Sequence, residues 1–266
     1  MARTVGSLLF WGFLVLSSLL LFPVAVLVWA VTAPFDRRLA WLHRFTCFWA
    51  SLYTWTNPAW RVSVEGRERI RPDETYVMVA NHLSLLDILV LFRLFTHFKW
   101  VSKIENFRVP CIGWNMRLNR YIELRRGDRE SVLRMLRACE ETLAEGNSIM
   151  MFPEGTRSPD GRMRAFKPGA FELSLRCDRP VLPIVIRGTS DALPKRGFLL
   201  RGRHPIHVRV LEAVRAEGFR EAGVEALTAH VRGLIAAELG DGAVVEGPAV
   251  APALPREHPS SFPATP

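Results

Sequence analysis

Cysteines are few in this sequence, and none of them pairs with another by spacing. Its 266 residues include four, all far apart: Cys47, Cys111, Cys139 and Cys177. This spacing fits neither a zinc site, which needs ligands at short fixed intervals, nor the disulfide framework of a small secreted domain. We therefore expect the folded part of the chain to lie in a reducing compartment.

Charge is absent from one long stretch near the start of the sequence. No charged side chain occurs from Val5 to Ala33. That run exceeds the about 20 apolar residues that a helix needs to cross a bilayer, and membrane helices tolerate a proline such as Pro23. A secretory signal peptide fits less well, because only Arg3 precedes the run and Pro34 follows the one plausible small-residue cleavage site.

The following segment, Leu39 to Trp60, is rich in aromatic side chains. It contains four tryptophans, and tryptophan prefers the interface between a bilayer and water. The segment fits either a second span or a helix lying flat in that interface. A hairpin of two helices that dips into the membrane suits both runs. We expect residues 1–60 to form these membrane helices.

Positive charge indicates an orientation and a class of partner. The uncharged run is preceded by Arg3 alone and followed by Arg37, Arg38 and Arg44. Because positive flanks tend to stay in the cytoplasm, we expect the chain in the inner, cytoplasmic membrane with its globular domain on the cytoplasmic side. The formal net charge of +9 and the pI of about 10.1 favour anionic partners: nucleic acid, lipid headgroups or phosphorylated substrates.

Residues 61–240 alternate between strand-like and helix-like segments. Strands are expected at Arg61–Val64, Thr75–Ala80, Lys99–Lys103, Arg120–Leu124, Ser148–Phe152, Val181–Arg187 and Ile206–Leu211. Helices are expected at Leu85–Phe95, Glu130–Glu145, Gly169–Arg176 and Val224–Leu239. This alternation predicts an α/β domain with a mostly parallel sheet flanked by helices. Residues 241–266 hold six prolines and few large apolar side chains, which predicts a disordered tail.

One strand-to-helix turn carries an imidazole and a carboxylate. The β-prone run that ends at Ala80 is followed by His82 and, five residues on, by Asp87. Open α/β sheets place their chemistry at the carboxyl ends of strands. A carboxylate that accepts a hydrogen bond from one imidazole nitrogen leaves the other free to take a proton. We therefore interpret His82 as a general base and Asp87 as the group that orients it.

A second polar loop follows the strand that starts at Ser148. It reads Phe-Pro-Glu-Gly-Thr-Arg-Ser over residues 152–158, and its proline ends the strand because it has no N–H for the ladder. Gly155 allows the backbone to turn or to approach a ligand closely. The loop then displays Glu154, Thr156 and Arg157. The arginine fork suits a phosphate, and the glutamate suits sugar or glycerol hydroxyls. An ordinary turn with an ion-paired arginine is the plainer alternative.

Further cations end two other predicted strands. Lys103 ends one, and Arg125 and Arg126 follow another. Lysine and arginine are usually surface charges. The carboxyl ends of parallel strands would nevertheless bring Lys103, one of the two arginines and Arg157 to one edge of the sheet, near His82. Converging cations predict an anionic substrate there.

These blocks resemble a known family. Four stretches are similar, in order, to the motif blocks of glycerolipid acyltransferases of the lysophosphatidic acid acyltransferase (PlsC-like) type: residues 81–87, 113–126, 152–158 and 181–185. The likeness covers about residues 60–215, and Lys103-Ile104-Glu105 resembles a Lys-x-Glu that often follows the first block. The second block differs from the family pattern at Glu123-Leu124, so its arginine corresponds either to Arg125 or to Arg126.

The resemblance implies transfer of a fatty acyl group from acyl-CoA or acyl carrier protein to the free hydroxyl of 1-acyl-sn-glycerol 3-phosphate, which makes phosphatidic acid. His82 would take the hydroxyl proton, and Asp87 would hold the ring. Acceptor binding would fall to Glu154, Gly155, Thr156, Arg157, Lys103 and Arg125. No cofactor or metal is expected, because a thioester is already activated. The expected partners are the bilayer, the lysophospholipid acceptor and the acyl donor.

Other hypotheses keep part of this pattern. The same chemistry could act on another lysophospholipid, a lyso-aminolipid or glycerol 3-phosphate. A metal-dependent hydrolase would use His82 and Asp87 as ligands, but no third ligand lies at a recognisable spacing. A non-catalytic membrane lipid-binding protein or scaffold would need no chemistry. A nucleic-acid binder is disfavoured, because no recognition helix or stacking motif accompanies the charge.

Overall fold

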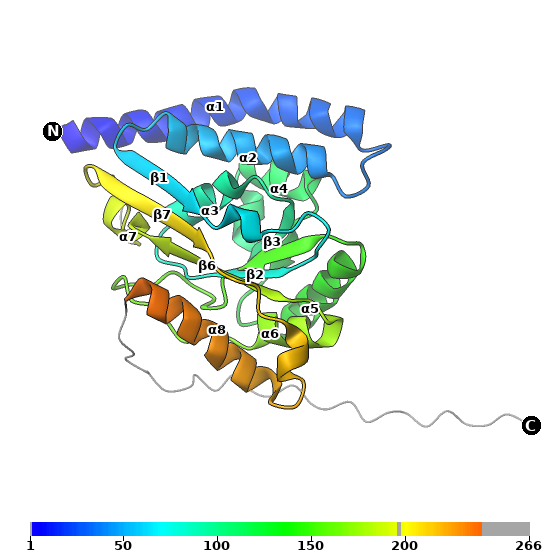
Figure 1. Cartoon of the computed structure of the whole chain (residues 1–266). Helices are drawn as coiled ribbons and strands as arrows, with labels where there is room; N and C mark the ends of the chain where they lie inside the picture. Colours follow the sequence, from blue (N-terminus) through cyan, green and yellow to red (C-terminus); the bar gives the residue numbers. More distant parts are fainter. Residues whose placement is uncertain (1, 196–197, 241–266) are drawn as a thin grey trace, which may run out of the picture.

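A seven-stranded sheet forms the centre of the fold (Figure 1). The computed structural model describes residues 2–195 and 198–240, so the tail predicted at 241–266 lies outside the described residues. The strands stand in the order β1-β7-β6-β2-β5-β3-β4. Their bounds are β1 Trp60–Glu65, β2 Val77–Ala80, β3 Phe98–Lys103, β4 Ile122–Leu124, β5 Ser148–Met151, β6 Val181–Arg187 and β7 His204–Val210.

The sheet is mostly parallel, as the alternation of segments predicted. Strands β6, β2, β5, β3 and β4 run in one direction. β7 is antiparallel to β6, and β1 is parallel to β7. All seven predicted strands are present, and no end is shifted by more than two residues. The carboxyl ends of the five parallel strands share one edge, which we call the carboxyl edge.

Helices cover both faces of the sheet (Figure 1). The α-helices are α1 Ala2–Thr32, α2 Ala40–Trp55, α3 Leu86–Leu91, α4 Ile112–Leu118, α5 Arg129–Ala144, α6 Gly169–Cys177, α7 Thr189–Ala192 and α8 Gly223–Leu239. Short 3₁₀ helices are η1 Arg67–Arg69, η2 Phe92–Leu94, η3 Ile104–Arg108 and η4 Ala216–Phe219. The four predicted helices correspond to α3 with η2, α5, α6 and α8.

Two apolar layers hold these helices to the sheet, as the alternation along β2 shows. Met78 and Ala80 point into a core shared with α1, α2 and α3, whereas Val77 and Val79 point into a core shared with α5, α6 and α8. Successive strand residues face opposite sides of a sheet. A strand that is apolar at every position, as β2 is, therefore belongs at the centre of a three-layer fold.

α1 is the one helix in the described part of the chain that is long and apolar enough to cross a bilayer. Its Arg3–Thr32 segment has a mean hydropathy of 2.6, and only 17% of its most apolar window is buried. Pro23 lies inside the helix without ending it. Tyr53 on α2 ties the two helices together, because its hydroxyl lies 3.0 Å from Ser17 Oγ and 3.2 Å from Ser18 Oγ on α1.

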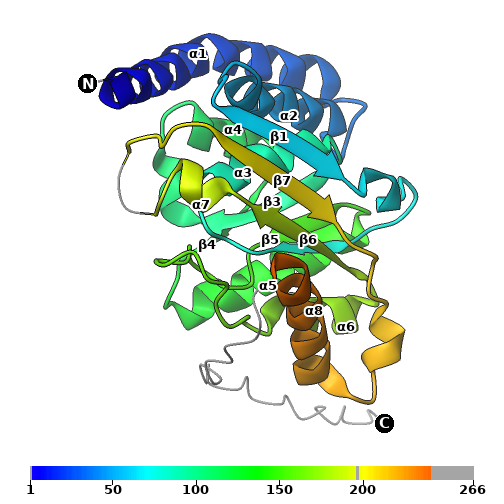
Figure 2. The same ribbon diagram turned by 60° about the vertical axis from the view of Figure 1, so that its left-hand side comes forward.

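α2 packs on the sheet domain as one arm of a helical hairpin with α1 (Figures 1 and 2). Leu42 and Cys47 belong to the same core as the sheet. His43 is buried with partners for both ring nitrogens, Tyr121 Oη at 2.9 Å and the Thr96 carbonyl at 3.0 Å. One face of the Leu39–Trp60 segment therefore packs against the sheet domain. Its outer face still carries an exposed aromatic stripe: Trp41, Phe48 and Trp55.

Candidate active site

His82 and Asp87 lie in the turn between β2 and α3, at the carboxyl edge. His82 Nδ1 and Asp87 Oδ2 are 2.9 Å apart. Asp87 is fully buried, while 9% of the His82 side chain is exposed. β2 ends at Ala80 and α3 begins at Leu86, so the short turn folds the first turn of the helix back onto the imidazole. The structure brings the two predicted side chains together.

The other bonds to Asp87 determine which ring nitrogen carries the proton. Oδ2 also accepts the backbone N–H groups of Leu83 at 2.7 Å and Ser84 at 2.8 Å. Oδ1 accepts the Thr189 hydroxyl at 2.5 Å. Because Oδ2 is already an acceptor for two backbone protons, Nδ1 is the donor in its bond to the ring. Nε2 of the neutral imidazole then keeps its lone pair and can act as a base.

Phe152 holds one face of the imidazole. The two rings stack with centroids 3.8 Å apart and planes 8° apart, and Trp100 packs against Phe152 at 5.5 Å. This stack limits rotation of the ring and keeps water from that face. Within the described part of the chain, Nε2 makes no hydrogen bond, so the potential base is unblocked.

Asn81 fixes the start of the same turn. Its Oδ1 accepts the Ile186 N–H at 2.8 Å, and its Nδ2 donates to the Ile186 carbonyl at 2.9 Å. The side chain therefore pairs with β6 in the manner of a strand backbone and aligns the residue after it, His82. Asn81 is part of the motif block at residues 81–87, but the sequence does not indicate its hydrogen bonds to Ile186.

Both carboxylate oxygens of Glu154 accept hydrogen bonds from the backbone. Oε1 accepts the backbone N–H of His82 at 2.7 Å, and Oε2 accepts that of Arg164 at 3.0 Å. Burial raises the pKa of Glu154 to about 7, against the opposing effect of these two bonds. Only 3% of the residue is exposed. Through the first of these bonds, Glu154 positions the backbone of His82.

The rest of the loop follows Glu154 along the carboxyl edge. Gly155 adopts a φ of +71°, and an added Cβ would lie 3.0 Å from Lys167 Cε, which explains why the position needs glycine. Thr156 and Arg157 are half-buried. The Arg157 carbonyl accepts Lys195 Nζ at 2.6 Å. Arg157 lies in the loop after β5, and β5 is the neighbour of β2 in the sheet.

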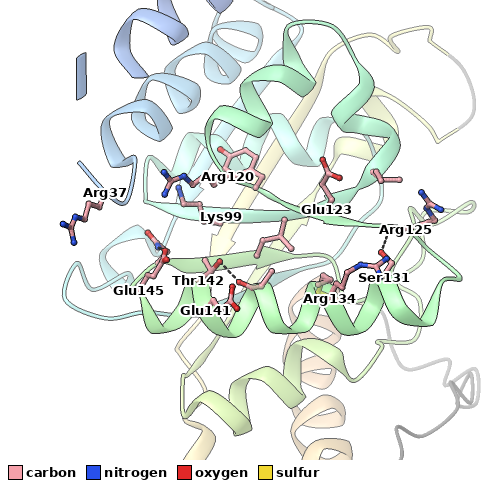
Figure 3. Close-up of a pocket in the computed structure, with 16 residues that line it drawn as sticks. Arg37, Lys99, Arg120, Glu123, Arg125, Ser131, Arg134, Glu141, Thr142 and Glu145 are labelled. Carbon is pink, nitrogen blue, oxygen red and sulfur yellow. Dashed lines mark hydrogen bonds between the residues drawn. The ribbon is translucent and has the colours of Figure 1, made fainter. Parts of the chain in front are cut away.

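The remaining predicted cations lie at the ends of two other strands, Lys103 at the end of β3 and Arg125 and Arg126 just after β4. Lys103 pairs with Glu105 at 3.2 Å at the end of β3. Arg125 lines a groove beside β4 and α5 (Figure 3). Burial lowers the pKa of Arg126, and the positive charge of Arg157 lowers it further, against Glu105. Of the two arginines, Arg126 is the one whose pKa is lowered by the charge of Arg157.

The groove in Figure 3 has a volume of about 480 Å³. It runs between the outer edge of β4 and α5, and both signs of charge line it, for example Arg120, Arg134, Glu141 and Glu145. His82, Asp87 and Arg157 are not among its lining residues. It is therefore separate from the turn that carries the imidazole.

No group of three or more His, Cys, Asp or Glu side chains with metal-binding geometry occurs among residues 2–195 and 198–240. Besides the bond to the imidazole, the oxygens of Asp87 accept hydrogen bonds from two backbone N–H groups and one hydroxyl group. The pair has the geometry of a base and its orienting carboxylate.

Comparison with known proteins identifies the family. Residues 61–187 match the sequence model of a family described as Acyltransferase. A 1-acyl-sn-glycerol-3-phosphate acyltransferase of Pseudomonas aeruginosa is 30% identical over 209 residues, which are 75% of this chain and 79% of that protein. The chain belongs to the lysophosphatidic acid acyltransferase (PlsC-like) family. His82, Asp87 and residues 152–158 all lie inside the matched segment.

Other comparisons agree with this family. A 1-acyl-sn-glycerol-3-phosphate acyltransferase of Chlamydomonas reinhardtii is 40% identical over 193 residues, 71% of this chain and 57% of that one. The chain spans about half the length of the algal and plant relatives that it matches. The crystal structure of the 1-acyl-sn-glycerophosphate acyltransferase PlsC from Thermotoga maritima shares the fold, with a TM-score of 0.72 and 24% identity over 90% of this chain and 97% of that one.

Proposed function

We propose that this acyltransferase moves a fatty acyl group from acyl-CoA or acyl carrier protein to the free hydroxyl of 1-acyl-sn-glycerol 3-phosphate. The product is phosphatidic acid. The contact between His82 Nδ1 and Asp87 Oδ2, 2.9 Å long at the carboxyl edge, carries the proposal. The names of the relatives support the choice of acceptor.

His82 acts as the general base in this reaction. Nε2 takes the proton of the acceptor hydroxyl as its oxygen attacks the thioester carbonyl carbon. The tetrahedral intermediate then collapses, the carbon–sulfur bond breaks, and the imidazolium returns the proton to the leaving thiolate. Asp87 holds the ring tautomer and stabilises the imidazolium between the two transfers. The thioester needs no metal and no enzyme nucleophile.

The acceptor phosphate lies between Arg157 and Arg126. Neighbouring strands are about 4.8 Å apart, so the ends of β2 and β4, three strand spacings apart, are about 14 Å apart. An acceptor with its hydroxyl at His82 extends its phosphate along this edge towards both guanidinium groups. Paired arginine forks favour a phosphate over a neutral headgroup. Lys103 ends the strand between them and adds positive charge.

The membrane supplies the acceptor. α1 is mostly exposed and apolar, and we propose that it lies in the bilayer of the inner membrane while the domain faces the cytoplasm. The exposed tryptophans of α2, Trp41 and Trp55, suit the interfacial layer beside it. The site then draws a lipid from the bilayer and a soluble thioester from the cytoplasm.

The test is an acyl-transfer assay with the purified full chain. Labelled acyl-CoA and acyl carrier protein are offered with 1-acyl-sn-glycerol 3-phosphate, other lysophospholipids, a lyso-aminolipid and glycerol 3-phosphate. We expect the first acceptor to be used best. Preference for another acceptor overturns the substrate, and no transfer to any acceptor overturns the enzyme itself.

Variants of His82 test the chemistry in the same assay. His82→Ala is expected to lower activity about 10²–10⁴-fold, the usual size of a general-base effect. His82→Asn keeps a donor for Asp87 but lacks Nε2, so it should lose as much activity while retaining the fold. His230→Ala, an exposed histidine on α8, is the matched control. A non-catalytic lipid-binding protein would bind lysophospholipid equally well in all three variants and show no transfer in the parent.

A further inference from the structure

The loop between α7 and β7 displays two large apolar side chains to solvent. Phe198 is 74% exposed and Leu199 is 55% exposed. The neighbouring residues of the loop face the other way, because Leu193 is buried and Leu200 packs on the core. The tip therefore presents apolar surface that the domain does not cover.

This tip is held in place by hydrogen bonds at its base and side. The Arg201 N–H donates to the Ala192 carbonyl at 2.8 Å and closes the neck of the loop. Trp11 Nε1 donates to the Phe198 carbonyl at 2.7 Å, and the Leu200 N–H donates to Ser7 Oγ at 2.9 Å. The backbone that carries the exposed side chains is therefore fixed by hydrogen bonds, two of which come from Trp11 and Ser7 on α1.

The position of the loop places it beside the apolar helix and the candidate active site. Figures 1 and 2 show the loop between α7 and β7 next to the amino-terminal end of α1. α7, which leads into the loop, follows the carboxyl end of β6. α1 exposes Leu8, Leu9 and Phe13 in this part. On its inner side, Lys195 Nζ binds the Arg157 carbonyl of the candidate acceptor loop.

Cations follow the apolar tip. Arg201 and Arg203 are exposed, and neither forms an ion pair with an acid in residues 2–195 or 198–240. Exposed apolar residues bordered by arginines are typical of segments that enter the acyl-chain region and leave guanidinium groups among lipid phosphates. A protein partner would require a surface of matching shape, whereas the adjoining apolar face of α1 continues this patch directly.

We propose that residues 198–203 form a second membrane contact, in which Phe198 and Leu199 enter the bilayer beside α1 and Arg201 and Arg203 bind the phosphates of anionic lipids. This inference rests on the proposed membrane location of α1 but not on the identity of the acceptor. The contact holds the acceptor loop at the bilayer surface through Lys195, so a lipid passes into the site without crossing water.

The first experiment measures insertion directly in the full chain. Leu199→Cys carries an environment-sensitive fluorophore in a Cys177→Ser background, because the other cysteines are buried. Leu133→Cys, an exposed position on α5, is the matched control. In vesicles of equal parts phosphatidylcholine and phosphatidylglycerol, we expect acyl-chain spin labels to quench the probe at 199 and not at 133. Equal quenching by aqueous iodide at both positions would overturn the proposal.

The second experiment uses activity with two forms of the acceptor. Phe198→Ser/Leu199→Ser should lower kcat/KM about tenfold for acceptor embedded in these vesicles and leave it unchanged for a short-chain, monomeric acceptor. The ratio of activity in vesicles that contain phosphatidylglycerol to activity in pure phosphatidylcholine vesicles should be about tenfold lower for Arg201→Gln/Arg203→Gln than for the parent. Equal losses with both acceptor forms would show a purely structural loop. If the chain transfers no acyl group at all, the proposed function fails while the fluorescence result still decides the membrane contact.

Discussion

Glu154 accepts the backbone N–H of His82 at 2.7 Å, so the loop after β5 positions the base through its main chain. The same carboxylate holds Arg164 N–H at 3.0 Å with its second oxygen. One buried side chain therefore joins the end of β2, the loop after β5 and the segment that leads to α6.

Glu154→Gln tests this positioning role. The amide offers one acceptor oxygen, so its NH₂ group faces a backbone donor and leaves it unpaired, which costs about 1–3 kcal/mol. We expect kcat to fall about tenfold with little change in KM for the acceptor, and the melting temperature to fall. Glu130→Gln on the exposed face of α5 is the matched control. A selective rise in KM with unchanged kcat would instead support direct glycerol binding.

Thr189→Val tests the contribution of the hydroxyl that bonds Asp87 Oδ1 at 2.5 Å. Valine keeps the shape and removes the bond. A hydrogen bond to a charged group contributes about 1.5–3 kcal/mol, so kcat should fall at least about tenfold. Thr228→Val, whose hydroxyl bonds its own helix at the Val224 carbonyl, should leave kcat unchanged. An unchanged kcat in Thr189→Val would show that the backbone donors alone hold Asp87.

Arg126→Ala and Arg125→Ala distinguish the two candidates for phosphate binding. Loss of a guanidinium–phosphate pair should raise KM for 1-acyl-sn-glycerol 3-phosphate about tenfold or more. We expect this rise for Arg126→Ala and a smaller one for Arg125→Ala, whose side chain lines the groove beside α5. KM for the thioester is the internal control. The reverse order would return the assignment to Arg125.

His97 should make stability depend on pH in the acid range. Burial, aided by the charge of Lys99, lowers its pKa from 6.5 to about 4, against the bond to Asn147. Between these values the unfolded chain binds a proton that the folded chain does not, so stability falls as pH decreases from 6.5 to 4. The loss should reach about 1–3 kcal/mol.

His97→Gln keeps a donor for Asn147 Oδ1, which His97 Nε2 approaches to 2.9 Å, but it cannot titrate. Its melting temperature in detergent micelles should therefore fall less than that of the parent between pH 6.5 and 4. The exposed His230→Gln should follow the parent. His43, buried beside His97 with a pKa that burial lowers in the same direction, accounts for the dependence that remains. Identical pH profiles for the parent and His97→Gln would contradict this account.

Local sequence signals sufficed to locate the strands, though not their order, and to predict the approach of His82 to Asp87. Apolar runs of four to seven residues bounded by turn residues define buried strands, and β6 begins and ends where its sequence predicts, at Val181 and Arg187. The spacing of His82 and Asp87 is short, so one turn determines their contact. Neither feature depends on knowledge of distant parts of the chain.

Contacts between distant segments escaped prediction. Thr189 and Asp87 are 102 positions apart, and Glu154 and the His82 N–H are 72 apart. Nothing in their local sequence indicates that they meet. The sequence also left open which of Arg125 and Arg126 corresponds to the arginine of the family's second block. α4 was also missed, since its seven residues are too few for a clear helical period.

The pairing of β1 with β7 has a consequence for how the protein is made. β1 is the first strand of the domain and β7 the last, and every residue of β1 from Trp60 to Glu65 is aligned with a residue of β7. During synthesis, α1 and α2 therefore leave the ribosome long before the outer part of the sheet can close. Until β7 is synthesised, the unpaired edge of β1 and the apolar surface of both helices are exposed and prone to aggregation. A chaperone or the membrane itself must protect the nascent amino-terminal segment, and truncation before β7 should yield a protein prone to aggregation.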